Sequence, residues 1–342
     1  MTKTVFFGAV AAAAVLASTG AYAAEGDTLR TVKQRGELIC GVNPGLVGFA
    51  APDANGNWSG FDISLCRAIA AAVVGDPNKV RFVPTTGQTR FTALSSGEVD
   101  VLTRNSTWSF QRDTELALDF PAVNYYDGQG FLVRKDLGVT SAKELDGATV
   151  CIQTGTTTEL NLADYFRANN ITYQPVNIDS NAEGEQQYLA GACDAYTTDA
   201  SGLAATRAAF ADPENHIILP EIISKEPLAP AVRHGDNNWG DIVRWTLFAL
   251  VAGEEYGVTS ANIEELSKSS TNPEVQRLLG QTDNLGGMIG LDAEWAKRAI
   301  MANGNYGEIF AATIGEQTPI GLARGLNALW TQGGLMYAPP FR

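Results

Sequence analysis

From about residue 36 onward, the sequence alternates short apolar runs, typical of buried strands, with segments whose apolar residues repeat at helical spacing. The runs 38–42, 80–84 and 99–103 predict strands, and the segments 61–74 and 89–96 between them predict helices. The same alternation restarts near residue 131 and continues to residue 219. A β-α-β-α-β order predicts parallel strands covered by helices, so we expect an α/β fold built from two such units.

The two units resemble each other. Leu94–Thr103 and Tyr188–Thr197 each contain the end of a predicted helix, a Gly, two intervening residues and then an Asp that leads into a strand. Gly at that place is typical of the position that follows a helix. The repeat predicts two similar lobes, each a mixed sheet flanked by helices. Ligands bind at the carboxyl edge of open α/β sheets, so two such edges that face each other would form a cleft.

The remaining expected elements follow the same spacing. In the second unit we expect strands at 131–134, 149–153, 173–178, 194–198 and 216–219, and helices at 142–145, 158–168, 183–190 and 202–210. Beyond residue 238 the pattern is mostly helical, with helices at 239–255, 263–268, 274–279, 293–303 and 306–314.

The chain is expected to cross between the lobes twice. Asp127–Gly130 reads as the outward crossing, and the run after Lys225, which contains Pro227 and Pro230, reads as the return. We therefore predict the first part of lobe 1 at 24–126, lobe 2 at 127–228, and the return of lobe 1 with a C-terminal helical extension at 229–342.

The composition excludes some functions. The chain has 24 Lys and Arg against 38 Asp and Glu, a formal charge of −14, which repels phosphate backbones and disfavours nucleic-acid binding. Two histidines and four well-separated cysteines leave no zinc-ligand cluster of the usual spacing, and Cys-x-x-Cys-His is absent. We therefore expect no metal and no cofactor.

The first residues have the pattern of an export signal. Residues 1–23 combine a basic start at Lys3, an apolar run from Val5 to Ala17 and a small-x-small end at Ala21-Tyr22-Ala23. The apolar run is shorter than the ~20 residues of a membrane-spanning helix. We expect removal of this segment near Ala23 and a mature protein in the periplasm.

Export changes the expected state of the cysteines. In an oxidising compartment an even number of cysteines suggests disulfides, and four allow three pairings. The pairs Cys40–Cys66 and Cys151–Cys193 keep each bridge local, and each would stabilise by ~3–4 kcal/mol through chain entropy. Four buried free thiols are the alternative.

Several motifs resemble a known family. They are Gly60-Phe-Asp-Ile, Ser96-Gly-Glu-Val-Asp-Val, Asn105-Ser-Thr-Trp-Ser-Phe-Gln-Arg112, Leu118-Asp-Phe-Pro, Leu145-Asp-Gly-Ala-Thr-Val-Cys-Ile-Gln-Thr-Gly-Thr-Thr157 and Cys193-Asp-Ala-Tyr-Thr-Thr-Asp199. In this order, across residues 36–314, they resemble the extracellular solute-binding proteins of polar amino-acid ABC transporters, and Cys40-Gly-Val-Asn and Arg104-Asn-Ser-Thr-Trp resemble the general L-amino-acid branch.

The resemblance implies a two-lobed Venus-flytrap fold with two crossover strands. It implies a monomer that captures L-amino acids, of broad and mostly polar range, by hinge closure and delivers them to an inner-membrane ABC permease. Binding without chemistry needs no cofactor and no catalytic residue.

The resemblance also implies a ligand set. An amino acid is a zwitterion, and each charge must meet a partner once a cleft closes over it. Arg112 would hold the carboxylate as a fork, and Thr156 and Thr157 would add backbone N–H groups and hydroxyls at a helix start. Asp199, with the Asn105 carbonyl and the Thr107 hydroxyl, would accept from the ammonium.

Each of these residues has a plainer interpretation. Arg112 could be an ordinary solvated arginine, Asp199 could cap the helix from Gly202, and the threonines after Gly155 could be only a helix start.

Other residues could line the cleft. Phe49, Trp58 and Trp108 are either cleft-lining or core aromatics. Narrower relatives carry an aromatic near Gly87, a basic residue at Gln153 and an acidic one at Asn43, and all three are absent here. These departures argue against a strictly cationic ligand and favour a roomy polar pocket.

Two other functions would fit the same scaffold. An exported dehydratase of cyclic acids would need a general acid in the cleft, and none of Glu98, Glu115 and Glu159 is obviously aimed there. A receptor module that feeds a membrane sensor would have the same docking surface.

Overall fold

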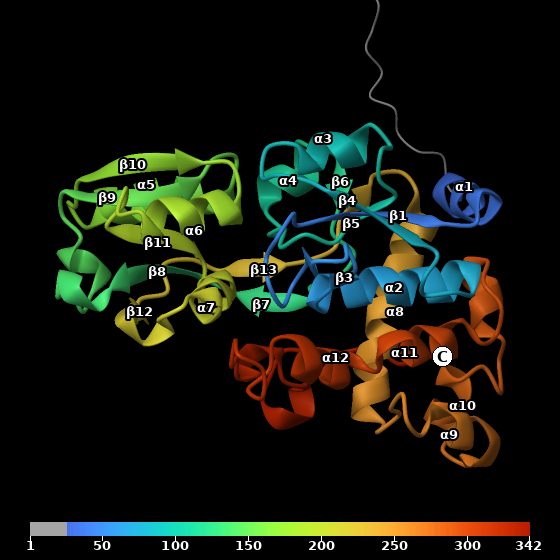
Figure 1. The fold of residues 1–342 in the computed structure, drawn as a ribbon. Coiled ribbons are helices and arrows are strands. Elements are labelled where there is room, and N and C mark those ends of the chain that lie inside the picture. The colour runs from blue at the N-terminus through green and yellow to red at the C-terminus, as the bar shows by residue number, and fades with distance from the viewer. Residues whose placement is uncertain (1–25) are drawn as a thin grey trace, which may run out of the picture.

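Two lobes lie side by side in the computed structural model, which describes residues 26–342 (Figure 1). The predicted export signal and its cleavage site lie outside the described residues. Within residues 26–342, no helix has the length and apolar character needed to cross a bilayer.

Lobe 1 is built on a parallel sheet with the order β4-β1-β5. Its strands are β1 (Leu38–Val42), β4 (Val80–Pro84) and β5 (Val101–Leu102), with the hairpin β2 (Ala51–Pro52) and β3 (Trp58–Ser59) beside them. Its helices are α1 (Asp27–Arg35), α2 (Phe61–Val74), α3 (Arg90–Ser95) and α4 (Phe110–Thr114). The bounds of α2 are those that the apolar spacing predicts, and β5 is shorter than the predicted strand 99–103.

Lobe 2 is built on a five-stranded sheet with the order β10-β9-β11-β8-β12. Its strands are β8 (Gln129–Arg134), β9 (Ala148–Gln153), β10 (Tyr173–Ile178), β11 (Ala195–Asp199) and β12 (His216–Ile218). Its helices are α5 (Thr157–Ala168), α6 (Asn181–Leu189) and α7 (Ala200–Ala209), with short 3₁₀ turns at Lys135–Leu137, Ala142–Glu144 and Pro213–Asn215. β9, β10 and β11 are parallel, whereas β8 runs antiparallel to both of its neighbours, so the sheet is mixed.

Two antiparallel strands join the lobes. β7 (Tyr125–Asp127) leads outward and pairs with the returning β13 (Glu226–Leu228), between the two sheets (Figure 1). A second short pair, β6 (Leu118–Asp119) and β14 (Val232–Arg233), continues into lobe 1. The return strand β13 lies in the predicted run after Lys225, whereas the outward strand β7 ends at Asp127, where the predicted crossing begins. The boundaries at 126/127 and 228/229 stay a prediction.

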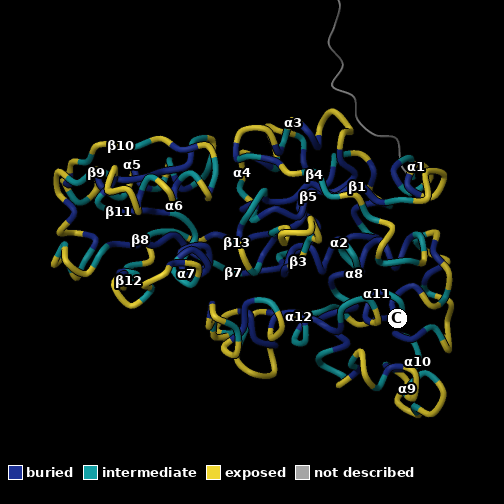
Figure 2. The backbone as a smooth tube through the Cα atoms, in the orientation of Figure 1, coloured by how far each residue is buried: buried dark blue, intermediate teal, exposed yellow. Residues whose placement is uncertain are grey.

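The C-terminal part packs against lobe 1. It contains α8 (Asn237–Glu255), α9 (Ile263–Ser269), α10 (Pro273–Leu278), α11 (Trp295–Asn303) and α12 (Tyr306–Thr313), with 3₁₀ turns at Leu285–Ile289, Gly325–Asn327 and Trp330–Gln332. The large core of lobe 1 includes Trp239 of α8 and Ile300 of α11 together with β1 and α2. Buried backbone runs along β1 and β8, while the outer loops are exposed (Figure 2).

The disulfide prediction is confirmed, and the alternative of four free thiols is wrong. Cys40 of β1 is bonded to Cys66 of α2, and Cys151 of β9 is bonded to Cys193 just before β11. The first bridge joins β1 to helix α2, and the second joins β9 to the segment just before β11, so each bridge lies within one lobe and neither involves β7 or β13.

Candidate functional site

A polar pocket lies between the carboxyl ends of the strands of the two lobes. Lobe 1 contributes Asn43, Leu46, Arg90, Arg104, Asn105 and Thr107. Lobe 2 contributes Gln153, Thr156, Thr157, Asn181, Thr198 and Asp199, among others. Of the residues expected from the sequence, the structure therefore brings together Asn43, Asn105, Thr107, Gln153, Thr156, Thr157 and Asp199.

Asp199 is the last residue of β11 and the N-cap residue of α7. Helix α7 begins at Ala200, two residues before the predicted start, yet the Asp199 side chain makes no capping hydrogen bond. Burial raises the pKa of Asp199 well above its ordinary value, and the nearby Asp127 and Glu226 carboxylates raise it further. The capping interpretation is therefore wrong, and the carboxylate faces the pocket without a partner among the described residues.

Two arginines that the sequence did not single out line the pocket. The side chains of Arg90 and Arg104 are almost completely buried, with exposed fractions of 2% and 3%. Arg90 donates weakly to Asn105 O (3.4 Å) and Ser106 Oγ (3.3 Å), and Arg104 donates to Thr85 O (3.1 Å). Among residues 26–342, Arg90 Nε and Arg104 Nη2 find no hydrogen-bond partner. Burial lowers the pKa of Arg104 to about 10 and lowers the pKa of Arg90 well below its ordinary value, because both cations lack the hydration they would have in water.

Arg112 lies behind the pocket wall. It is the third residue of α4, is 7% exposed, and donates from Nη1 to Thr107 O at 2.9 Å. Its guanidinium lies 5.0 Å from the centre of the Phe91 ring, and that of Arg90 lies 4.7 Å from the same ring. Burial lowers the pKa of Arg112 to about 10. The alternative that Arg112 is a solvated surface arginine is wrong.

These three guanidinium groups have no carboxylate within 4.0 Å among the described residues. Buried arginines are ordinarily paired, because an unpaired buried charge is costly. The three cations of the site therefore lack a nearby negative charge, and the carboxylate of a ligand that enters the pocket would provide one.

The threonines at the start of α5 divide into two kinds. Thr156 is the N-cap residue: its hydroxyl accepts from the Glu159 N–H (3.3 Å) and donates to Gln153 O (2.6 Å), as a plain helix start predicts. Thr157 occupies the first helical position, where backbone N–H groups have no partner inside the helix. Its hydroxyl donates to Glu226 at 2.9 Å. Both hydroxyls already donate within the protein, so of the two kinds of donor expected here only the backbone N–H groups remain available to a carboxylate.

The three aromatic candidates do not line the pocket. Phe49 is buried in the lobe 1 core against Phe61 and Tyr125, and Trp58 packs on Phe82. Trp108 stacks on Phe120 at the surface. Phe49 and Trp58 therefore follow the core interpretation, whereas Trp108, which is 41% exposed, belongs neither to the core nor to the pocket lining.

The lobes touch across the cleft. Asn43 donates to Asn181 Oδ1 (3.1 Å), and Gln88 donates to Thr154 Oγ1 (2.6 Å). A Cβ atom at Gly87 would lie 3.0 Å from Thr154 O and 3.2 Å from Thr156 Cγ2. The space beside Gly87, where narrower relatives carry an aromatic, is therefore occupied by Thr154 and Thr156 of lobe 2.

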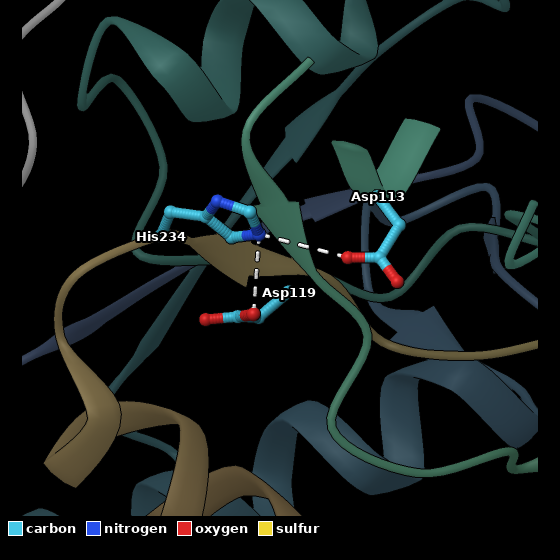
Figure 3. Close-up of side chains that lie close together, drawn as sticks. All are labelled: Asp113, Asp119 and His234. Carbon is cyan, nitrogen blue, oxygen red and sulfur yellow. Dashed lines mark ion pairs between the residues drawn. The ribbon is translucent and has the colours of Figure 1, made fainter. Parts of the chain in front are cut away.

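Another cluster of charged side chains holds α4 in place. His234, which follows β14, places Nε2 3.2 Å from Asp119 Oδ1 and 3.6 Å from Asp113 Oδ1 (Figure 3). Asp113 also accepts from the Trp108 indole at 3.0 Å. These atoms lie close enough together to ligate a metal ion, a grouping that sequence spacing did not reveal because its members come from three separate segments. In the structure they tie Asp113, the neighbour of Arg112, to the returning strand.

The comparisons with known proteins agree with this geometry. The family described as bacterial extracellular solute-binding proteins, family 3, matches residues 38–262. This chain belongs to that family. The expected recognition and the two-lobed fold are thereby confirmed.

Close relatives of this family 3 protein are amino-acid-binding proteins. The glutamate/glutamine/aspartate/asparagine-binding protein BztA of Rhodobacter capsulatus is 69% identical over 342 residues, which cover 100% of both chains. The general L-amino acid-binding periplasmic protein AapJ of Rhizobium johnstonii is 57% identical, over 99% of this chain and 100% of the relative. An ABC transporter periplasmic binding protein from Brucella ovis, solved with glutathione bound, superposes with a TM-score of 0.90 at 55% identity, over 92% of this chain and 99% of that one.

Proposed function

We propose that this protein captures free L-amino acids in the cleft, acidic ones included, and presents them to an ABC permease in the inner membrane. One observation carries the proposal: the same pocket is lined by the Asp199 carboxylate, which makes no capping hydrogen bond, and by the guanidinium groups of Arg90 and Arg104, which have no carboxylate partner among the described residues. A zwitterion carries both charges that such a pocket lacks.

Each charged group of the ligand then has a proposed partner. The ammonium is assigned to Asp199. The α-carboxylate is assigned to the first backbone N–H groups of α5 and to Arg112, which uses one N–H group on Thr107 O and has others left for a ligand. The side-chain carboxylate of glutamate or aspartate is assigned to Arg90 and Arg104.

The relatives support a broad rather than a single specificity. BztA is named for two acidic amino acids and their amides, and AapJ for L-amino acids in general. The Brucella ovis protein holds glutathione, whose γ-linked glutamyl residue keeps a free α-ammonium and α-carboxylate. The amino-acid head group is common to all three ligand sets, so one site that recognises this head group would serve them all.

Titration calorimetry of the exported form with the twenty L-amino acids and glutathione tests the proposal. We expect glutamate and aspartate to bind with dissociation constants near or below micromolar, which corresponds to ~8 kcal/mol. Arg90→Gln should weaken glutamate by at least ~10-fold, as expected for loss of a charge-assisted hydrogen bond, and change glutamine less. Absence of heat with every amino acid would refute the function.

Two further assays separate the alternatives. An enzyme would consume a cyclic acid or amino acid on prolonged incubation, whereas a binding protein returns it unchanged. Recovery of the protein with a membrane permease supports transport, and recovery with a membrane sensor alone would favour the receptor function.

A further inference from the structure

Glu226 is a buried carboxylate directly behind the pocket. It lies in the returning crossover strand β13, is 1% exposed and does not line the pocket. Its oxygens accept hydrogen bonds from the hydroxyls of Thr107 and Thr157, from Asn161 Nδ2 (2.7 Å) and from Ser224 Oγ (2.6 Å). Thr107 belongs to lobe 1 and Thr157 to lobe 2, so one carboxylate holds a hydroxyl of each lobe.

These bonds determine what the two threonines can offer to a ligand. A hydroxyl has one hydrogen and two lone pairs, and both hydroxyls already give their hydrogen to Glu226. Toward the pocket, each oxygen therefore presents lone pairs only. The two oxygens lie 3.3 Å apart, so they form a pair of acceptors at the junction of the lobes.

We propose that Glu226 is a positioning residue that makes the Thr107 and Thr157 hydroxyls acceptors and thereby completes the ammonium site. The proposal rests on the proposed amino-acid binding. An ammonium group has three hydrogens to donate, and Thr107, Thr157 and the unpartnered Asp199 provide three acceptors in the same pocket. The same arrangement rejects a ligand group that offers only acceptors at that place.

The substitution Glu226→Gln tests this role because it keeps the size and shape of the side chain but replaces one acceptor oxygen with a donor NH₂ group. Both threonine hydroxyls bond the same oxygen, Oε2, so where the glutamine amide nitrogen takes the place of that oxygen, each hydroxyl must turn its hydrogen toward the pocket. We expect the affinity for L-glutamate to fall by ~10-fold or more, the usual effect of a lost hydrogen bond to a charged group. The affinity for glutarate, which is glutamate without its amino group, should stay within about twofold of the wild-type value.

A matched control and a double-mutant cycle complete the experiment. Asn161→Ala removes another donor to Glu226 without changing either hydroxyl, so it should leave the ratio of glutamate to glutarate affinity unchanged. If glutarate binds too weakly to measure, Thr107→Val decides the question with glutamate alone. It should weaken binding by ~10-fold in the wild type and have little further effect in the Glu226→Gln protein.

The outcomes are distinguishable. Equal weakening of both ligands by Glu226→Gln would overturn the positioning role even though the wild type binds amino acids. No weakening of either ligand, together with a Thr107→Val protein that binds glutamate as tightly as the wild type does, would also overturn it. A wild type that binds none overturns the proposed function itself. If the Glu226→Gln protein fails to fold, Thr107→Ser and Thr107→Val replace it: the serine should keep the preference for glutamate over glutarate, and a valine variant that also keeps it contradicts the acceptor role.

Discussion

At the scale of single residues, the ammonium-binding role proposed for Asp199 would couple ligand binding to protonation. Burial, followed by the nearby carboxylates of Asp127 and Glu226, raises its pKa well above the ordinary value. A bound ammonium favours the ionised carboxylate, so molecules in which Asp199 is protonated must release a proton on binding. We expect amino-acid affinity to fall as the pH drops through this raised pKa.

Calorimetry in buffers of different ionisation enthalpy measures that proton. The wild type should release a fraction of a proton per glutamate bound, and this fraction should grow as the pH is lowered toward the pKa of Asp199. Asp199→Asn should abolish the release and weaken binding by ~10-fold or more. Proton release that persists unchanged in the Asn variant would assign it to another group.

The sequence located only part of this site. Asp199, Thr107 and Asn105 could be predicted because they lie in motifs at the carboxyl ends of strands. Arg90 and Arg104 could not, because an arginine near a strand end is ordinarily exposed, and only the packing of both lobes shows that these two are buried and unpaired. Glu226 was missed for the same reason: its partners come from residues 107, 157 and 161.

At the scale of elements, the C-terminal extension holds the outward crossover strand. The buried Asn327 side chain accepts from the Tyr126 backbone N–H at 2.7 Å and donates to Tyr126 O at 3.1 Å. Tyr126 is the middle residue of β7, and its other edge pairs with β13. The extension therefore completes the hydrogen bonding of the hinge, a role that its helical pattern in the sequence did not indicate.

Replacing Asn327 with Ala leaves the Tyr126 N–H and C=O without those partners. We expect a loss of unfolding free energy of ~1–3 kcal/mol, and faster amide exchange across Tyr125–Asp127. Asn238→Ala is the matched control, because it removes a single bond from an asparagine to Ile289 O (3.2 Å), away from β7. Unchanged exchange at β7 in Asn327→Ala would mean that the extension does not support the hinge.

At the scale of the whole molecule, the α/β order, the two lobes and both disulfides followed from strand and helix periodicity and from the local spacing of the cysteines. Those features depend on contacts within one lobe, between segments that lie near each other in the sequence. The features that periodicity could not supply all join distant segments: the closed contact at Gly87, the cluster of His234 with Asp113 and Asp119, and the burial of charged groups between the lobes.

Two buried carboxyls, Asp62 in α2 of lobe 1 and Asp127 at the end of β7, contribute to how stability varies with pH. Burial raises the pKa of Asp62 to about 7, although the Asn105 N–H, Asn124 and Arg104 oppose the shift, and burial raises that of Asp127 to about 6. In the unfolded chain both carboxyls titrate near their ordinary value of about 3.9. The folded protein therefore holds these protons more tightly, and the stability they contribute is lost as the pH rises through about 6 and 7.

We therefore expect the unfolding free energy to decrease between about pH 5 and about pH 8, because carboxyls with a lowered pKa, such as Asp53 and Asp146, are already ionised throughout that range. Urea denaturation at both pH values measures the difference. Asp62→Asn should flatten the slope, since it removes one of the groups that bind the extra proton, while Asp53→Asn, at an exposed turn, should leave it as in the wild type. If the unfolding free energy of Asp62→Asn falls with pH as steeply as that of the wild type, the proton linkage lies at Asp127 and Asp199 near the hinge. In that case, adding glutamate to the wild type would reduce the dependence of its unfolding free energy on pH.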